Sequence, residues 1–208
     1  MTNGVVRSWP LTGAAACATL FVTLAAAVAA GVVQGADVEL RRRQPRVEHG
    51  PVWRGAMAVT ALGYPKVQIP LAAAVSLGLR RAGVPNAADV VTAACTVFVA
   101  DEGCKRLIGR RRPPGHQSGK TNQSFPSGHT ASTAAITLTT AILLGRARVV
   151  SPRRALAGAA AATIVMAESR LLLDEHWASD VVAGLALGTV TALLVIHRPR
   201  RPRVSQHA

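Results

Sequence analysis

The segment 169–180, SRLLLDEHWASD, concentrates ionisable side chains between two stretches rich in alanine, valine and leucine. His176 and Asp180 are four residues apart, so on a helix they share one face. A carboxylate placed in this way can accept a hydrogen bond from one ring nitrogen and leave the other nitrogen unprotonated for attack on a substrate. Arg170 lies six residues before the histidine. The pattern indicates either a reactive histidine or a structural His–Asp pair.

The tetrapeptide PSGH, residues 126–129, begins an apolar stretch and could bind an anion. Backbone N–H groups in the first turn of a helix are unpaired and carry partial positive charge. Ser127 adds a hydroxyl group, Gly128 permits close approach, and His129 follows within one turn. Taken alone, these residues are also typical of an ordinary turn in which Ser127 caps the helix.

A third group has the spacing K-x6-R-P, with Lys105, Arg112 and Pro113. An arginine can hold two phosphate oxygens with its two-pronged guanidinium group, and a lysine adds a compact second charge. The alternative is a basic cluster beside the membrane that attracts anionic lipid headgroups. That simpler role would suit the neighbouring arginines, Arg106, Arg110 and Arg111.

Six apolar runs have to position these polar groups. They cover residues 11–33, 55–79, 90–100, 127–144, 155–167 and 177–196. The first is long enough to cross a hydrocarbon core of about 30 Å, and it is longer than the apolar part of a typical cleaved signal peptide, the alternative for this run. We expect an all-α polytopic membrane protein with about six transmembrane helices. It would form one domain over residues 1–196, followed by a basic disordered tail, residues 197–208.

Alternating helix directions would bring the three polar groups together. The third run ends near Lys105, the fourth begins at Ser127, the fifth ends near Arg170, and the sixth begins near His176. All four positions then lie at one membrane face. The polar segment between the third and fourth runs is rich in glycine and proline, and a long loop of this kind inside a compact protein is usually functional.

Together the three groups resemble the signature motifs of the type 2 phosphatidic acid phosphatase superfamily. The order K-x6-R-P, P-S-G-H and S-R-x5-H-x3-D matches that family. The matching residues are Lys105, Arg112, Pro113, Pro126, Ser127, Gly128, His129, Ser169, Arg170, His176 and Asp180. Three motifs with the correct order and spacing form a far more specific signal than any one of them, and the six-run layout extends the resemblance to most of the chain.

The resemblance implies a phosphatase that forms a phosphohistidine intermediate. His176 would attack phosphorus, Asp180 would fix the tautomer of that histidine, and His129 would protonate the leaving oxygen and then activate water. The equatorial oxygens would be held by Lys105, Arg112, Ser127, Gly128 and Arg170. A cage of fixed positive charge of this kind needs no metal or other cofactor, and the sequence has no cluster with metal-ligand spacing.

The implied substrate is a phosphorylated lipid of the bilayer, such as a polyprenyl diphosphate, phosphatidic acid or a phosphorylated glycolipid. The motifs leave the lipid open, and they leave the oligomeric state open as well. Two alternatives use the same anion cage: an enzyme similar to the soluble vanadium-dependent haloperoxidases, and a catalytically silent lipid-phosphate binder. The formal net charge of +14 would also suit a nucleic-acid partner, but the basic residues lie in short loops and only 3% of the residues are aromatic.

Two acidic residues outside the motifs are candidates for supporting roles. Glu168 lies near the end of an apolar run, where an unpaired carboxylate is costly, so it could pair with Arg110, Arg111 or Arg112 or else face water. Asp101 lies one helical turn before Lys105 and could orient it. Small packing residues are the simplest reading of the three cysteines, Cys17, Cys95 and Cys104.

The distribution of basic residues bears on orientation. With a cytoplasmic N-terminus, the cytoplasmic face would carry 11 arginines and the opposite face 12 arginines and lysines. Without Lys105, Arg112 and Arg170, which would bind phosphate in either orientation, the opposite face carries 9, a small margin in favour of this orientation under the positive-inside rule. Bacterial members of the family that the motifs resemble commonly present the site outside the cytoplasm. We expect cytoplasmic N- and C-termini and an extracytoplasmic site.

Overall fold

The computed structural model describes residues 5–45, 47, 49–115 and 123–198, and within them the fold is all-helical, as expected. The helices are α1 (Val5–Ala29), α2 (Gln34–Arg43), α3 (Pro51–Ala61), α4 (Pro65–Arg81), α5 (Asp89–Ile108), α6 (Gly128–Arg146), α7 (Pro152–Leu172) and α8 (Ala178–His197). Most of the expected basic tail, and Gln117 in the long loop, lie outside the described residues.

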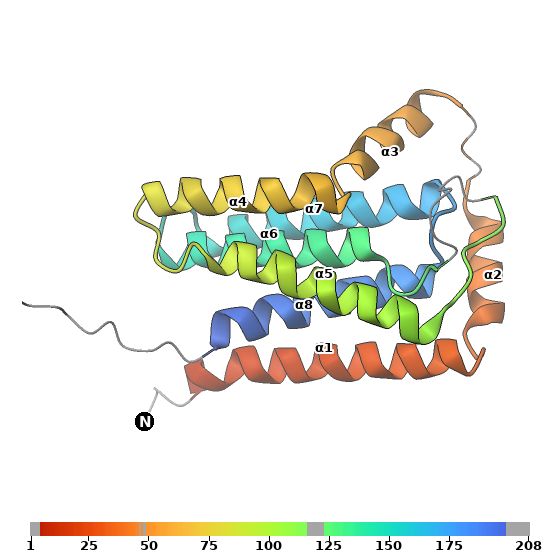
Figure 1. Cartoon of the computed structure of the whole chain (residues 1–208), viewed down its shortest axis with the longest axis horizontal. Helices are drawn as coiled ribbons and strands as arrows, with labels where there is room; N and C mark the ends of the chain where they lie inside the picture. Colours follow the sequence, from red (N-terminus) through yellow and green to blue (C-terminus); the bar gives the residue numbers. More distant parts are fainter. Residues whose placement is uncertain (1–4, 46, 48, 116–122, 199–208) are drawn as a thin grey trace, which may run out of the picture.

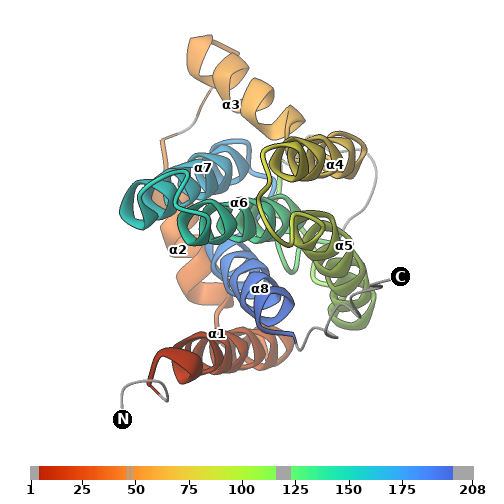
Figure 2. The same cartoon turned by 90° about the vertical axis from the view of Figure 1, so that its left-hand side faces the viewer.

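The long helices form a bundle around α6. Figure 2 shows α6 in the middle, with α4, α5, α7 and α8 around it and α1 packed against α8. The sequence of α6 is rich in alanine and threonine, and such small residues let neighbouring helices approach closely. Figure 1 shows α2 lying across one end of the bundle and α3 projecting away from it. That end also carries the loop after α5 and the turn between α7 and α8.

The second expected span differs from the sequence-based prediction, and so does the segment between the first two apolar runs, which was expected to be a polar connector. Residues 55–79 do not form one helix, because the chain breaks between α3 and α4 at Tyr64, whose backbone is extended (φ −70°, ψ 138°). Pro65 follows, and proline disfavours helical geometry in the residue before it. The connector near residues 34–51 contains α2, which has Asp37 in its first turn and arginines in its last, the charge arrangement that a helix dipole favours.

Three of the helices in the described chain are long and apolar enough to cross a membrane. They are Leu11–Ala29 within α1, Pro152–Leu172 and Ala178–His197. The other expected spans fall short because α4 is only 17 residues long, α5 carries four charged residues in its last two turns, and α6 is rich in threonine. Length and composition therefore support three of the six expected crossings.

Two glycines bring α8 against the backbone of α6. A Cβ atom at Gly184 would lie 2.5 Å from the carbonyl oxygen of Ser127, and one at Gly188 would lie 2.2 Å from that of Ala131. Both separations are shorter than any side chain tolerates, so these positions require glycine. The spacing of four residues places both glycines on one face of α8. This close crossing holds the start of α6 against the start of α8, where the polar motifs lie.

Replacement of Gly188 by alanine should therefore destabilise the protein. The added methyl group meets a backbone oxygen that cannot move alone, and overpacking of this kind costs about 1–3 kcal/mol. Thermal unfolding in detergent should show a Tm several degrees lower. Gly158→Ala is the matched control because a Cβ at Gly158 has nothing within 4 Å, and its Tm should stay the same or rise. Equal Tm values for the two variants would contradict the role given to the crossing.

Candidate active site

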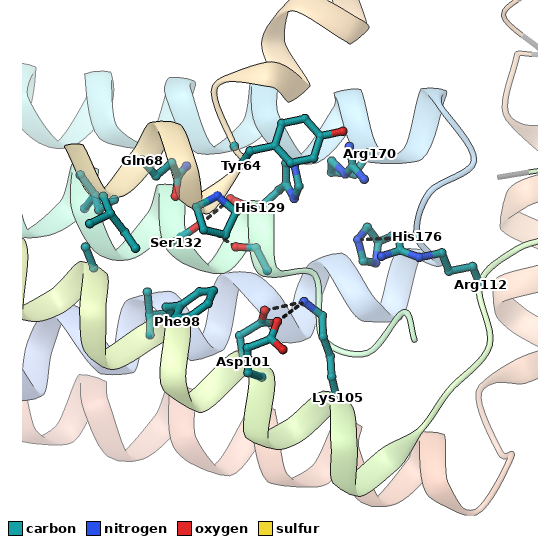
Figure 3. A pocket seen from close by; sticks show the side chains of 18 residues that line it. Tyr64, Gln68, Phe98, Asp101, Lys105, Arg112, His129, Ser132, Arg170 and His176 are labelled. Atoms are coloured by element: carbon teal, nitrogen blue, oxygen red, sulfur yellow. Dashed lines mark hydrogen bonds and ion pairs between the residues drawn. The ribbon is translucent and has the colours of Figure 1, made fainter. Parts of the chain in front are cut away.

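A cavity of about 320 Å³ lies within the bundle toward the end that α2 crosses. Seven of the residues singled out in the sequence line it: Asp101, Lys105, Arg112, Gly128, His129, Arg170 and His176. They come from α5, α6, α7 and two loops, so the structure brings the three motifs together as their order implied. In Figure 3, Lys105, Arg112 and Arg170 approach from different sides, and His129 and His176 lie apart along the cavity. The lining also includes apolar side chains, Ile69, Val97, Phe98 and Ile136.

His176 lies in the turn between α7 and α8 and is only 4% exposed. Its Nδ1 is 2.8 Å from the backbone oxygen of Ser124. A carbonyl oxygen can only accept a hydrogen bond, so Nδ1 must carry the proton and donate it. The other nitrogen, Nε2, is then unprotonated, and it accepts from Nη1 of Arg112 at 3.2 Å. The ring thus presents its lone pair on the side that lines the cavity.

Asp180 does not occupy the position that the sequence suggested for it. Its Oδ2 is 3.6 Å from Nδ1 of His176, longer than a hydrogen bond, and it accepts instead from the backbone N–H of Trp177 at 2.9 Å. Its Oδ1 accepts from Nη1 of Arg110 at 2.6 Å. The carboxylate is committed to capping α8 and to Arg110, and the acceptor for Nδ1 is therefore Ser124. Asp180 still places a buried negative charge beside the imidazole.

The surroundings of His176 keep its imidazole neutral. Burial lowers the pKa of His176 well below its ordinary value of 6.5, and the positive charges of Arg112, Arg170 and Lys105 lower this pKa further. The hydrogen bond to Ser124 opposes these effects without reversing them. A neutral imidazole at pH 7 is the form that can act as a nucleophile.

Each cation of the cavity has an acidic partner. Lys105 Nζ lies 2.5 Å from Oδ2 of Asp101, so the contact expected between these residues is present. Glu175 joins the two arginines, because its Oε2 lies 3.3 Å from Nη1 of Arg112 and 3.4 Å from Nη2 of Arg170. Sequence reasoning missed Glu175. The signal available in the sequence was its position next to His176, in the segment 169–180 that also contains Arg170.

Glu168 does not pair with the arginines proposed for it. Its side chain is exposed, and within the described residues no ion pair joins it to them. Arg110 pairs with Asp37 and Asp180, and Arg112 pairs with Glu175. The helix geometry explains the difference: Glu168 is two residues before Arg170, about 200° around α7, and so faces away from the cavity.

The first turn of α6 meets the cavity through Gly128 rather than Ser127. A Cβ at Gly128 would lie 2.4 Å from Oδ2 of Asp101 and 3.0 Å from Nζ of Lys105, so only glycine leaves room for this ion pair. The hydroxyl of Ser127, expected to bind phosphate, is fully buried 3.0 Å from that of Thr130 and does not line the cavity.

His129 projects into the cavity from the same turn. Its ring packs edge-on against Tyr64, with ring centroids 5.0 Å apart, and a Cβ at Gly63 would lie 2.1 Å from its Cδ2. Within the described residues its Nε2 is buried and has no hydrogen-bond partner. A buried nitrogen without a partner is costly, and a phosphate or leaving-group oxygen in the cavity would satisfy it.

Comparison with known proteins decides the family. The model of the PAP2 superfamily matches residues 86–203, which include all three motifs. The chain belongs to the PAP2 superfamily. A crystal structure of a transmembrane PAP2-type phosphatidylglycerolphosphate phosphatase from Bacillus subtilis has the same fold, with a TM-score of 0.76 over 88% of this chain and 94% of that one, at 23% identity.

Two curated relatives share part of this PAP2 chain. A lipid A 1-phosphatase from Rhizobium johnstonii is 35% identical over 101 residues, which are 43% of this chain and 38% of that protein. A decaprenylphosphoryl-5-phosphoribose phosphatase from Mycobacterium tuberculosis is 37% identical over 100 residues, 44% of this chain and 49% of that protein. The match therefore spans less than half the length of either relative.

The position of Glu175 predicts how the cavity responds to its loss. Glu175→Gln removes a negative charge that occupies donors of Arg112 and Arg170, so orthovanadate, an analogue of phosphate, should bind more tightly. A dissociation constant about tenfold lower would correspond to roughly 1.4 kcal/mol. The neighbouring carboxylate offers a control, Asp174→Asn, because Asp174 pairs with Arg41 rather than with these arginines. If Glu175→Gln weakens vanadate binding, the carboxylate holds the arginines in place instead of competing for them.

Proposed function

We propose that this PAP2 protein is an integral-membrane phosphatase that hydrolyses a lipid phosphate or a polyprenyl diphosphate through a phosphohistidine intermediate. One observation carries the proposal: His176 Nε2 is unprotonated and lines a cavity with Lys105, Arg112 and Arg170. A nucleophile surrounded by three cations is suited to attack on a phosphoryl group, whose charge these cations stabilise.

In the first step the lone pair of His176 Nε2 forms a bond to phosphorus. The bond from phosphorus to the leaving oxygen breaks, and that oxygen takes a proton from His129, which would have to be protonated at this stage. Arg112 shifts its donors from Nε2 to the oxygens of the phosphoryl group. The imidazole becomes positively charged as the bond forms, and the buried carboxylate of Asp180, 3.6 Å from Nδ1, compensates that charge.

In the second step a water molecule attacks the phosphohistidine. His129, now neutral, accepts a proton from the water, and the bond between phosphorus and Nε2 breaks. Inorganic phosphate leaves, and both histidines return to their starting protonation states. The position of His129 in the same cavity, with its Nε2 unpartnered within the described chain, supports this double role.

The cavity and the relatives together support a lipid as the substrate. The same cavity that holds the cations is lined by Ile69, Val97, Phe98 and Ile136, which could contact the first part of a hydrocarbon chain. The relatives are named as phosphatases of lipid A at its 1-phosphate and of decaprenylphosphoryl-5-phosphoribose, both lipid-linked phosphates. A candidate panel therefore contains a polyprenyl diphosphate, phosphatidic acid, phosphatidylglycerolphosphate and a phosphorylated glycolipid.

Phosphate release from this panel in detergent micelles tests the proposal. The wild-type protein should release phosphate from at least one lipid, and His176→Ala should reduce kcat by more than about a thousandfold, as removal of a nucleophile does. A phosphoryl-labelled substrate should leave acid-labile, base-stable label on the protein that is absent from His176→Ala. His49→Ala is the control, because His49 stacks on Trp53 outside the cavity. Substantial turnover by His176→Ala would contradict the mechanism.

We further propose that both termini are cytoplasmic and the site is extracytoplasmic, which follows from the distribution of basic residues. Arg111 and Arg153 are both exposed. Arg111 follows the end of α5 and Arg153 is in the first turn of α7, and Figure 1 shows these two helix ends at opposite ends of the bundle. In a background with serine in place of the three cysteines, Arg111→Cys should react with an impermeant maleimide in intact cells, whereas Arg153→Cys should react only after lysis. The reverse labelling pattern would show that the protein has the opposite orientation.

A further inference from the structure

Arg110 occupies an unspecified position of the K-x6-R-P motif, between Lys105 and Arg112. It is nevertheless one of the most tightly held side chains near the site. It follows Gly109, which ends α5 in the left-handed conformation, and its side chain is 8% exposed. Nη1 donates to Oδ1 of Asp180 at 2.6 Å, and Nη2 donates to Oδ2 of Asp37 at 2.6 Å. The guanidinium also lies over the ring of Trp177, 5.5 Å from its centroid. Arg110 thus joins a carboxylate of α8 to a carboxylate of α2.

Asp37, on α2, contacts the start of α8 as well as Arg110. It is 3% exposed, and its carboxylate accepts from the backbone N–H of Ser179 at 3.0 Å and from the Ser179 hydroxyl at 2.6 Å. Ser179 is in the first turn of α8, where backbone N–H groups lack partners within the helix. Asp37 therefore binds both the start of α8 and the arginine that holds Asp180.

The backbone of Arg110 supports the other group that faces His176. Its carbonyl oxygen accepts from the N–H of Ser124 at 2.7 Å, and the carbonyl of Ser124 accepts from Nδ1 of His176 at 2.8 Å. One residue thus positions both neighbours of Nδ1: Ser124 through its backbone and Asp180 through its side chain. Neither Asp37 nor Arg110 lines the cavity, so neither is placed to bind phosphate.

We propose that Asp37 and Arg110 act as positioning residues for the nucleophile, because together they hold Asp180 and Ser124 around Nδ1 of His176. This inference rests on the proposed phosphatase function. Two buried carboxylates share one guanidinium, so the group as a whole keeps a negative charge beside an imidazole that becomes positive when phosphorus is attacked. The pair should therefore stabilise the transition state and the phosphohistidine, with little effect on substrate binding.

A split between kcat and KM tests this role. Asp37→Asn and Arg110→Gln should each lower kcat by about tenfold or more, while KM and the inhibition constant of inorganic phosphate stay within about twofold of the wild-type values. The controls are Glu39→Gln, an exposed carboxylate on the same helix that pairs with Arg43, and Arg106→Gln, an exposed arginine of α5. Neither control should change kcat.

A double-mutant cycle shows whether Asp37 acts through Arg110. If it does, Asp37→Asn should have little further effect on kcat in the Arg110→Gln protein. Ser179→Ala is a milder variant, because it removes a hydroxyl that contacts both Arg110 and Asp37 but leaves no buried charge unpaired. It should lower kcat by about threefold. It supplies the test where a charge-changing variant no longer binds inorganic phosphate because it is misfolded.

The outcomes distinguish a failure of the positioning role from a failure of the proposed phosphatase function. Wild-type protein that releases phosphate from none of the lipids would overturn the proposed function and this inference with it. Active wild-type protein with unchanged kcat in Asp37→Asn, Arg110→Gln and Ser179→Ala would overturn the inference alone. Additive effects in the cycle, or losses confined to KM and phosphate affinity, would also overturn it.

Discussion

The hydrogen bond from Nδ1 of His176 to the carbonyl of Ser124 is the interaction on which the proposed chemistry depends. It fixes the tautomer, so Nδ1 carries the proton and Nε2 keeps its lone pair. Two helices must cross closely for it to form, because Ser124 lies just before α6 and His176 just before α8. The N–H of Ser127 donates to the carbonyl of Asp180 at 3.0 Å, and Gly184 and Gly188 allow the two backbones to approach. The close crossing of α6 and α8 therefore places the carbonyl of Ser124 within hydrogen-bond distance of the His176 ring.

The charges at this end are tolerable because they are arranged in mutually compensating groups. Buried ions cost several kcal/mol each unless they are paired and hydrogen-bonded. Lys105 pairs with Asp101, and Glu175 lies between Arg112 and Arg170. Glu102 also lines the cavity, 3.8 Å from Lys105 Nζ, so three cations face three carboxylates there. A cage that is already ordered loses little free energy to reorganisation when charge develops in the transition state.

The motifs were enough to predict which segments meet, but not every contact they make. Lys105, Arg112, His129, Arg170 and His176 line one cavity, as their order and spacing implied. The acceptor for His176 is a backbone oxygen, which side-chain patterns cannot reveal. Residues 34–43 appeared to be a polar connector because one short helix of mixed charge has no apolar period.

Other contacts were missed because the partners lie far apart in the sequence. Arg110 looked like one of several lipid-attracting arginines, yet its partner Asp37 is 73 residues away. Ser127 and Glu168 carried the right chemical groups, but helix geometry turns the first toward Thr130 and the second away from the cavity. Whether a side chain points into the cavity depends on which face of its helix is buried. When small residues lie on several faces of a helix, the sequence indicates only weakly which face that is.

The first helices of the chain pack against the last one. Both α1 and α2 contact α8, and α8 begins just after His176. During synthesis α1 and α2 emerge long before the helix that they pack against, so these contacts close only at the end of translation. A chain that stops before α8 has neither Asp180 nor the partner that covers α1. An incomplete copy therefore exposes an unpaired helix face, and the fold is complete only once α8 has been made.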